Sequence, residues 1–262
     1  MQVVIVPTPE EVGRVAAAAI AKVVAERPDA VLGVATGSSP LAIYRELARR
    51  VAEGSLDFSA ARAFALDEYV GLPLDHPESY HSVIRREVTE RLGMKPALVH
   101  VPDGSAGDLG RACADYERMI HEAGGVDIQI LGIGTNGHIG FNEPTSSFAS
   151  RTRIKTLAPR TRADNARFFD DPEQVPTHCL TQGLATILDA RRLVLVAQGE
   201  AKADAVARMV EGPVSSMCPG SALQLHPHAT VVVDEAAAAR LELADYYRYT
   251  YAHLPAWQRF ED

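Results

Sequence analysis

Short apolar segments alternate with amphipathic segments along almost the whole chain. The apolar segments predict strands at residues 2–6, 30–35, 62–66, 98–101, 128–133, 193–197 and 229–233. The segments between them predict helices at residues 9–26, 41–53, 79–91, 108–123, 181–188, 201–211 and 234–247. The first helix has the clearest start, because Thr8 suits the N-cap, Pro9 the first turn, and Glu11 a capping box.

This alternation of strands and helices predicts βαβ units and a mostly parallel sheet. Residues 30–35 are continuously apolar, which is typical of a strand that is buried on both faces. No low-complexity linker, internal repeat or break in composition divides the chain. The sequence therefore predicts an α/β fold: a single-domain, Rossmann-like three-layer sandwich over residues 1–262, with helices on both faces of the sheet.

Composition and charge restrict the possible partners. The 262 residues are 47% hydrophobic and carry a formal net charge of -8, which argues against nucleic acid as the main ligand. The three cysteines, at 113, 179 and 218, are widely separated and fit a reducing compartment. No signal peptide and no segment long enough to span a membrane is evident. We therefore expect a cytoplasmic protein with no membrane partner.

Polar and glycine-rich segments follow four of the predicted strands, at residues 36–40, 67–69, 132–143 and 199–202. In parallel α/β sheets, ligands bind beyond the carboxyl ends of the strands. These four segments are therefore expected to converge on one site, and their convergence is stronger support for a site than any single motif.

The segment Thr36-Gly37-Ser38-Ser39-Pro40 joins a buried strand to a helix start. Its hydroxyls and the free N–H groups of the helix would suit an anion such as a phosphate. Simple N-capping by Ser39 explains the segment equally well. It is neither a P-loop nor a dinucleotide-binding fingerprint, so a nicotinamide-dependent dehydrogenase is excluded.

Two further segments carry groups that could transfer protons. His138 and Glu143 lie in a loop with Gly132, Gly134, Gly137 and Gly140, which suggests an acid/base group and its orienting partner. Asp67 follows a buried strand, where a carboxylate can have a raised pKa and act as a base towards a carbon acid. The competing readings are that the histidine caps a neighbouring element and that Asp67 caps a loop.

Positive charge is concentrated between Arg151 and Arg167, against the acidic balance of the chain. Guanidinium groups bind phosphate, and Lys202 would add a point charge beyond residues 193–197. A solvated basic face is the alternative. The histidines show no ligand-like spacing, so no metal is expected.

Taken together, these motifs resemble the glucosamine-6-phosphate deaminases (isomerising). The resemblance rests on the segments at residues 36–40, 67–72, 76–80, 132–144, 150–153, 165–169 and 221–226. It implies conversion of glucosamine 6-phosphate to fructose 6-phosphate and ammonia, in amino-sugar catabolism, without a cofactor. By similarity, Asp67 moves the proton from C2 to C1, and His138, oriented by Glu143, assists ring opening.

The resemblance also assigns binding residues and exposes one departure. The implied phosphate ligands are Thr36, Gly37, Ser38, Ser39, Arg167 and Lys202. Asn136 stands at a catalytic position where many relatives carry Asp, so Glu143 is the only carboxylate partner that the sequence offers His138. Some relatives are activated by N-acetylglucosamine 6-phosphate at a subunit interface. The residues matching that second site are Ser146, Arg153, Lys155 and Tyr249.

A homo-oligomer, a trimer or hexamer if allosteric, is therefore expected, with a sugar phosphate as substrate. Two rival functions stay open at this point. A 6-phosphogluconolactonase would explain the phosphate loop and the histidine, although not the motifs around Asp67 and Glu143. A catalytically silent sugar-phosphate sensor would explain Asn136. The choice between glucosamine and galactosamine 6-phosphate also stays open.

Overall fold

The seven predicted strands all form, and they build one parallel sheet in the computed structural model, which describes residues 1–255 and 258–259. Across this sheet the strands are β1 (Gln2–Val6), β10 (Ala229–Asp234), β9 (Leu193–Ala197), β6 (Ile128–Leu131), β2 (Val31–Val34), β3 (Arg62–Ala65) and β5 (Val99–His100). Each neighbouring pair is parallel. The predicted domain end at residue 262 lies outside the described residues.

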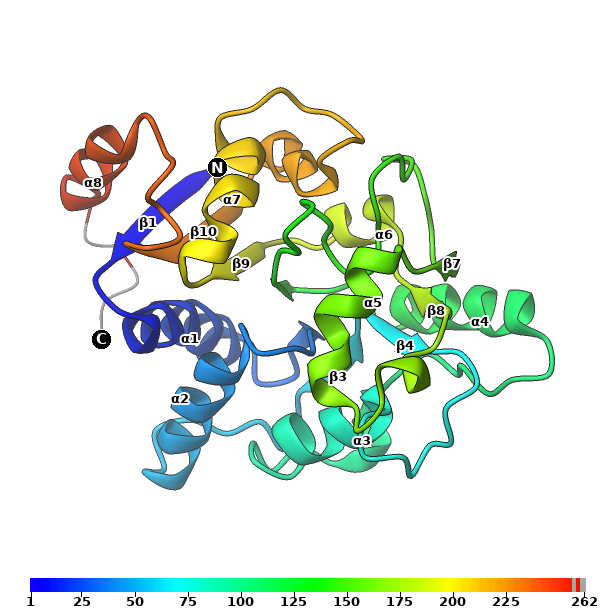
Figure 1. The fold of residues 1–262 in the computed structure, drawn as a ribbon. Coiled ribbons are helices and arrows are strands. Elements are labelled where there is room, and N and C mark those ends of the chain that lie inside the picture. Colours follow the sequence, from blue (N-terminus) through cyan, green and yellow to red (C-terminus); the bar gives the residue numbers. More distant parts are fainter. Residues whose placement is uncertain (256–257, 260–262) are drawn as a thin grey trace.

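Helices cover this sheet, which confirms the predicted three-layer α/β fold. The helices of the described residues are α1 (Pro9–Glu26), α2 (Leu41–Ala52), α3 (Tyr80–Ile84), α4 (Leu109–Glu122), α5 (Pro159–Asn165), α6 (Leu184–Leu188), α7 (Ala203–Val210) and α8 (Ala244–Ala252). Figure 1 shows α1 and α2 below the strands and α7 above them. The predicted start of α1 is confirmed, since the Thr8 side chain accepts a hydrogen bond from the Glu11 N–H.

Two predicted helices begin later than expected. Thr181 is not helical but ends strand β8, and α6 starts only at Leu184, after Gly183 in an extended conformation. Asp234 ends β10 instead of opening a helix. Its carboxylate accepts hydrogen bonds from the N–H groups of Gly199 and Ala237, which fixes a turn, and α8 begins ten residues later at Ala244.

The predicted helix at residues 79–91 is also modified. Ser79 caps α3 by accepting a hydrogen bond from Ser82 N–H, and the chain then continues as a π-helical turn, η1 (Arg85–Thr89). Segments of 3₁₀-helix occur at η2 (Pro96–Leu98), η3 (Ala166–Phe168), η4 (Pro172–Gln174), η5 (Glu200–Lys202) and η6 (Pro219–Leu225).

A second, antiparallel sheet was not predicted. Strands β4 (Asp67–Tyr69), β8 (His178–Thr181) and β7 (Arg153–Thr156) form it, with β8 in the centre. Gln182 fastens it to the large sheet, because its backbone N–H and its side-chain amide donate to the carbonyls of Leu66 and Ala65. This small sheet carries Asp67 towards the loops at the end of the large sheet.

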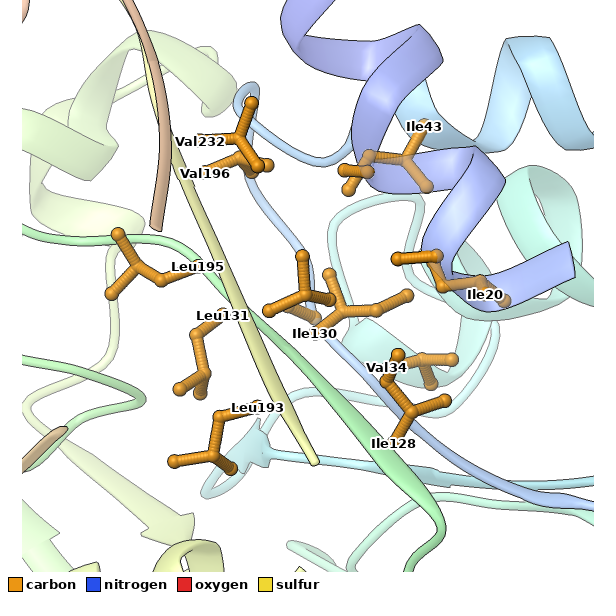
Figure 2. Packing of buried hydrophobic residues seen from close by; sticks show 14 of the residues in the cluster. Ile20, Val34, Ile43, Ile128, Ile130, Leu131, Leu193, Leu195, Val196 and Val232 are labelled. Atoms are coloured by element: carbon orange, nitrogen blue, oxygen red, sulfur yellow. The ribbon is translucent and has the colours of Figure 1, made fainter. Parts of the chain in front are cut away.

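The core lies on both faces of the large sheet. Figure 2 shows Ile128 and Ile130 of β6 on the side of Ile20 and Ile43, whereas Leu131 points to the other side. All five side chains are at most 2% exposed. Each such side chain contributes roughly 1.5–3 kcal/mol relative to an exposed one, which explains why the strands are apolar throughout.

The strand order determines where a ligand can bind. After β2 the chain adds β3 and β5 on one side and then returns to place β6, β9 and β10 on the other. The loops that leave the carboxyl ends of β2 and β6 therefore diverge, and such a switch point opens a crevice. The loops concerned are residues 35–40 and 132–143. Among the described residues, no helix is long and apolar enough to cross a membrane.

Candidate active site

A cavity of about 400 Å³ opens at this switch point. Its wall contains most of the predicted site residues, from segments far apart in the chain: Thr36, Gly37, Ser38, Ser39, Asp67, His138, Arg167 and Lys202. A larger cavity, about 830 Å³, lies at the amino-terminal ends of β1, β9 and β10, but none of the described residues that line it is an Asp, a Glu or a predicted site residue. The chemistry is therefore concentrated in the smaller cavity.

One side of the cavity suits an anion. Gly37 adopts a left-handed conformation (φ +88°), which turns the chain sharply between β2 and α2. Arg167 reaches this loop and donates from Nη2 to Ser38 Oγ at 3.2 Å. The ammonium of Lys202 donates to the carbonyl of Ile133 at 2.7 Å, and its pKa is lowered by burial and by the charge of Arg167. Two cations held close together are stabilised when an anion lies between them.

The alternative reading of this loop, N-capping by Ser39, does not describe α2. The N-cap of α2 is Pro40, and no side chain caps it. The hydroxyl-rich loop is therefore not explained by the needs of the helix, and the N-terminal end of α2 faces the cavity with Leu41 in its wall.

Asp67 forms a second corner of the cavity. It follows β3, begins β4, and is only 5% exposed. Burial, and to a smaller extent the nearby charge of Glu68, raise the pKa of its carboxyl to about 8, although the hydroxyl of Thr181 acts in the opposite direction. A carboxyl with such a pKa exchanges protons near neutrality, as a general base for a carbon acid requires.

Glu68 has a different task, although it is adjacent and also buried. Its carboxylate accepts hydrogen bonds from the backbone N–H groups of Tyr69, Tyr80 and His81 at 2.7–2.9 Å. It thus accepts hydrogen bonds from backbone N–H groups at the N-terminus of α3 that have no partner within the helix. Because neighbouring residues of a strand point to opposite faces, Asp67 is left facing the cavity.

His138 is held through a relay. Its Nδ1 lies 2.7 Å from Asn136 Oδ1, and Asn136 Nδ2 donates to Glu143 Oε2 at 2.7 Å. Glu143 itself is 3.7 Å from Nδ1, and its other oxygen accepts from the N–H of Ala158. The sequence predicts Glu143 as the carboxylate partner of the histidine and Asn136 as the source of a neutral hydrogen bond, and in the structure Asn136 lies between the two.

This relay determines which imidazole nitrogen carries the proton. The amide of Asn136 must point its NH₂ at the carboxylate, so its oxygen faces the ring and can only accept. Nδ1 of His138 is therefore the donor and Nε2 is the basic nitrogen. Burial lowers the pKa of His138, and the charge of Glu143 opposes this only in part, so the ring is neutral near pH 7.

The basic run between Arg151 and Arg167 is mostly bound to the protein itself. Arg151 pairs with Asp189, Arg162 donates to the carbonyl of Val175, and Arg160 pairs with Asp164 while also lining the cavity. Of the arginines in this run, Arg167 is the one that contacts the phosphate-type loop.

Sequence reasoning missed an aromatic wall of the cavity. Tyr80 and Phe141 stack there, with ring centroids 6.0 Å apart and an interplanar angle of 18°. Both residues belong to the motifs that carried the resemblance, but neither was named as a site residue. The alternation of glycine and apolar residues around Phe141 was the available signal.

The residues matched to a second phosphate site do not meet within one chain. Arg153 and Lys155 are neighbours on β7, where Arg153 donates to Asn142 Oδ1 at 2.8 Å. Ser146 is buried, and its hydroxyl has no partner among the described residues. Tyr249 is 62% exposed on α8, which packs against β1 at the opposite end of the molecule (Figure 1).

Known proteins resemble this chain both in sequence and in fold. A family model for glucosamine-6-phosphate isomerases and 6-phosphogluconolactonase matches residues 8–233. A glucosamine-6-phosphate deaminase of Streptomyces coelicolor is 62% identical over 259 residues, which is 98% of this chain and 99% of the relative. One of Mycolicibacterium smegmatis is 60% identical, with the same coverage of both chains.

Solved structures agree. A monomeric glucosamine-6-phosphate deaminase superimposes with a TM-score of 0.90 at 44% identity, covering 92% of this chain and 100% of that one. A 6-phosphogluconolactonase of Trypanosoma cruzi gives a TM-score of 0.74 at 19% identity, covering 92% and 97%. The latter is a likeness of fold alone.

The substitution Gly134→Ala tests the position of the His138 imidazole ring. A Cβ at residue 134 would lie 2.1–2.4 Å from three atoms of the imidazole ring, so the ring must leave its place and its contact with Asn136. We expect the lowered pKa of His138 to return towards 6.5, the value without burial. Titration of the ring Cε1 proton by NMR measures this. Gly107→Ala is the control, because a Cβ there meets nothing within 4 Å. An unchanged midpoint of the His138 titration in Gly134→Ala would contradict the proposed position of the ring.

Proposed function

Since this chain belongs to the glucosamine-6-phosphate deaminase family, we propose that it converts glucosamine 6-phosphate and water to fructose 6-phosphate and ammonia. In reaction class it is a hydrolase of a C–N bond with a coupled aldose–ketose isomerisation. The observation that carries the proposal is the convergence of Asp67, His138 and the loop at residues 36–39 on one cavity. A sugar phosphate needs all three: an anion site, a group for ring opening, and a base for C2.

The phosphate would bind between the loop at residues 36–39 and the two cations. Arg167 and Lys202 supply the charge, and the hydroxyls of Thr36, Ser38 and Ser39 can donate to the phosphate oxygens. Lys202 would exchange its hydrogen bond to the carbonyl of Ile133 for the phosphate. Anchoring at this end would fix the sugar so that its other end lies between His138 and Asp67.

His138 would open the pyranose ring. Its neutral Nε2 can accept the proton of the C1 hydroxyl while the bond from C1 to the ring oxygen breaks, and it can then deliver that proton to the ring oxygen. Asn136 and Glu143 keep Nδ1 protonated, so that Nε2 stays basic. The product of this step is the open-chain aldehyde.

Asp67 would move the proton from C2 to C1. Removal of the C2 proton, with transfer of a proton from the substrate's ammonium group to the C1 oxygen, gives an enolamine, and return of the C2 proton to C1 gives an iminium ion at C2. Because one carboxyl must reach two adjacent carbons, a fixed and shielded position suits this role. The ammonium group of the substrate would favour the ionised form of Asp67, against the effect of burial.

Water completes the reaction. It adds to C2 of the iminium ion, and collapse of the resulting carbinolamine releases ammonia and leaves the C2 ketone of fructose 6-phosphate. No step in this sequence requires an oxidant or a reductant, so the expected absence of a cofactor is consistent with the chemistry.

The rival functions are less well supported. The 6-phosphogluconolactonases resemble this chain at the level of fold, whereas deaminases share about 60% of its residues over the full length. A silent sensor was suggested by Asn136 alone. The relay from His138 to Glu143 through Asn136 argues against that reading, because the asparagine performs the orienting task for which a carboxylate was expected.

Activation by N-acetylglucosamine 6-phosphate and assembly into a trimer or hexamer stay predictions of the sequence. A site made from Ser146, Arg153 and Lys155 together with Tyr249 would need a second subunit, because α8 lies far from β7. The 44% identical relative is monomeric. We further propose that residues 1–262 act as one domain in the cytoplasm, in keeping with three free, buried cysteines.

Ammonia release from glucosamine 6-phosphate by the parent protein and by Asp67→Asn tests the function and the base together. We expect turnover by the parent and a loss of at least about 10³-fold in kcat for the variant, because the amide cannot accept a proton. Binding of the sugar phosphate should be retained. Lactone hydrolysis without ammonia release by the parent would overturn the function, and an unaffected variant would remove Asp67 from the mechanism.

Glu143→Gln tests the relay. A glutamine cannot accept from both Asn136 Nδ2 and the Ala158 N–H, so it would favour rotation of the Asn136 amide and the wrong tautomer of His138. We expect roughly a 10²-fold lower kcat, a typical contribution of a positioned acid/base group. The readout is turnover of the cyclic substrate, with the binding of inorganic phosphate as the control. Near-normal turnover would contradict the role of Glu143 in orienting His138.

A further inference from the structure

Thr181, on the central strand of the small sheet, touches both halves of the site without lining the cavity. It is fully buried, and it lies directly opposite Asp67 in the pairing of β8 with β4. Its Oγ1 accepts the backbone N–H of Phe141 at 3.0 Å, in the loop that carries His138. The hydroxyl also lowers the pKa of the Asp67 carboxyl, which faces it across the two strands.

We propose that Thr181 is a positioning residue that holds Asp67 in both of its protonation states and fixes it relative to the histidine loop. This inference rests on the proposed function, in which the carboxyl of Asp67 takes a proton from C2 and returns it to C1. A group that alternates between carboxylate and carboxylic acid needs a partner able to serve both forms.

The hydroxyl of Thr181 has the donor and acceptor sites that the two protonation states of Asp67 require. It carries one proton and two lone pairs, and one lone pair is taken by the N–H of Phe141. When Asp67 is ionised, the hydroxyl can donate its proton to the carboxylate. When Asp67 is protonated, the second lone pair can accept the acid proton, and the hydroxyl can turn to the carbonyl of Gln182, 3.4 Å away.

Gly140 shows how closely these groups are packed. A Cβ at this position would lie 3.1 Å from Thr181 Oγ1 and 3.5 Å from Asp67 Oδ2, and the residue has a φ of +53°. The histidine loop therefore passes directly over the pair formed by Thr181 and Asp67. A side chain larger than that of glycine at residue 140 would contact both groups, so neither has free space on this side.

Other titratable groups near Asp67 do not replace Thr181. They are Glu68 and Tyr69 on the same strand, Cys179 on β8, Tyr80 on α3, Tyr116 on α4, and His138 in the cavity wall. Burial raises the pKa of the thiol and of the three phenols, so all four stay neutral near pH 7. Glu68 is occupied by three backbone N–H groups.

Thr181→Val and Thr181→Ser separate the hydroxyl from the shape of the side chain. Valine keeps the volume but cannot donate a hydrogen bond to the carboxylate, so the pKa of Asp67 should rise. The acid limb of the pH profile of kcat should then move to higher pH by about one unit. At a fixed pH below this limb, kcat should be about tenfold lower than in the parent. KM should stay within about twofold of the parent, since Thr181 does not line the cavity. Serine should restore the parent limb. Comparing each variant with the parent cancels the ionisations of the substrate itself.

Thr230→Val is the matched control, because Thr230 is a buried threonine on β10 of the large sheet, away from the site. Its pH profile should follow that of the parent. Should Thr181→Val fail to fold, Thr181→Ala removes the same hydroxyl and carries the same expectation. A parent-like acid limb in a folded hydroxyl-free variant, or a serine variant as impaired as valine, would overturn the proposal.

A second readout distinguishes this proposal from the proposed function. Carbon-13 NMR of labelled aspartate, assigned by comparison with Asp67→Asn, follows the ionisation of Asp67 without substrate. The pKa of Asp67 should be higher in Thr181→Val than in the parent. An unchanged pKa would overturn the role of Thr181 even in an active deaminase, whereas a parent that releases no ammonia would overturn the function alone.

Discussion

The burial of one carboxyl is the constraint on which the site depends. Asp67 is held at the junction of two sheets, where loss of water makes its charged form costly and brings its pKa to about 8. The large parallel sheet supplies the rigid crevice, and the small antiparallel sheet carries the carboxyl into it. Without the second sheet, the loop after β3 would have no partner to hold Asp67 away from solvent.

Asn136 gains a defined role from the same reasoning. An aspartate at this position would place a second negative charge beside Glu143 and next to His138, which would raise the pKa of the imidazole. The neutral amide instead passes the orienting effect of Glu143 to Nδ1 and leaves the ring uncharged. The imidazole ring is therefore oriented by the hydrogen bonds of Asn136 and not by a charged group bonded directly to it.

Much of the fold was predictable because the strands of the large sheet are apolar on both faces. The small sheet was not, since β7 alternates basic residues with exposed neighbours and β4 has only three residues. The sequence predicts Thr181 in a helix because an apolar run follows closely, but Gly183 separates Thr181 from that run and ends the strand. The loops of the site were identified from their glycines and polar groups. The order His138, Asn136, Glu143 was not, because it depends on the turn at Gly137 (φ +91°).

The central claim is that one shielded carboxyl carries a proton from C2 to C1. Turnover of glucosamine 6-phosphate with deuterium at C2, in ordinary water, tests it most directly. Because Asp67 is only 5% exposed, part of the deuterium should appear at C1 of fructose 6-phosphate before it exchanges with solvent, as measured by NMR of the early product. Complete loss of the label to water from the first turnovers would contradict the account.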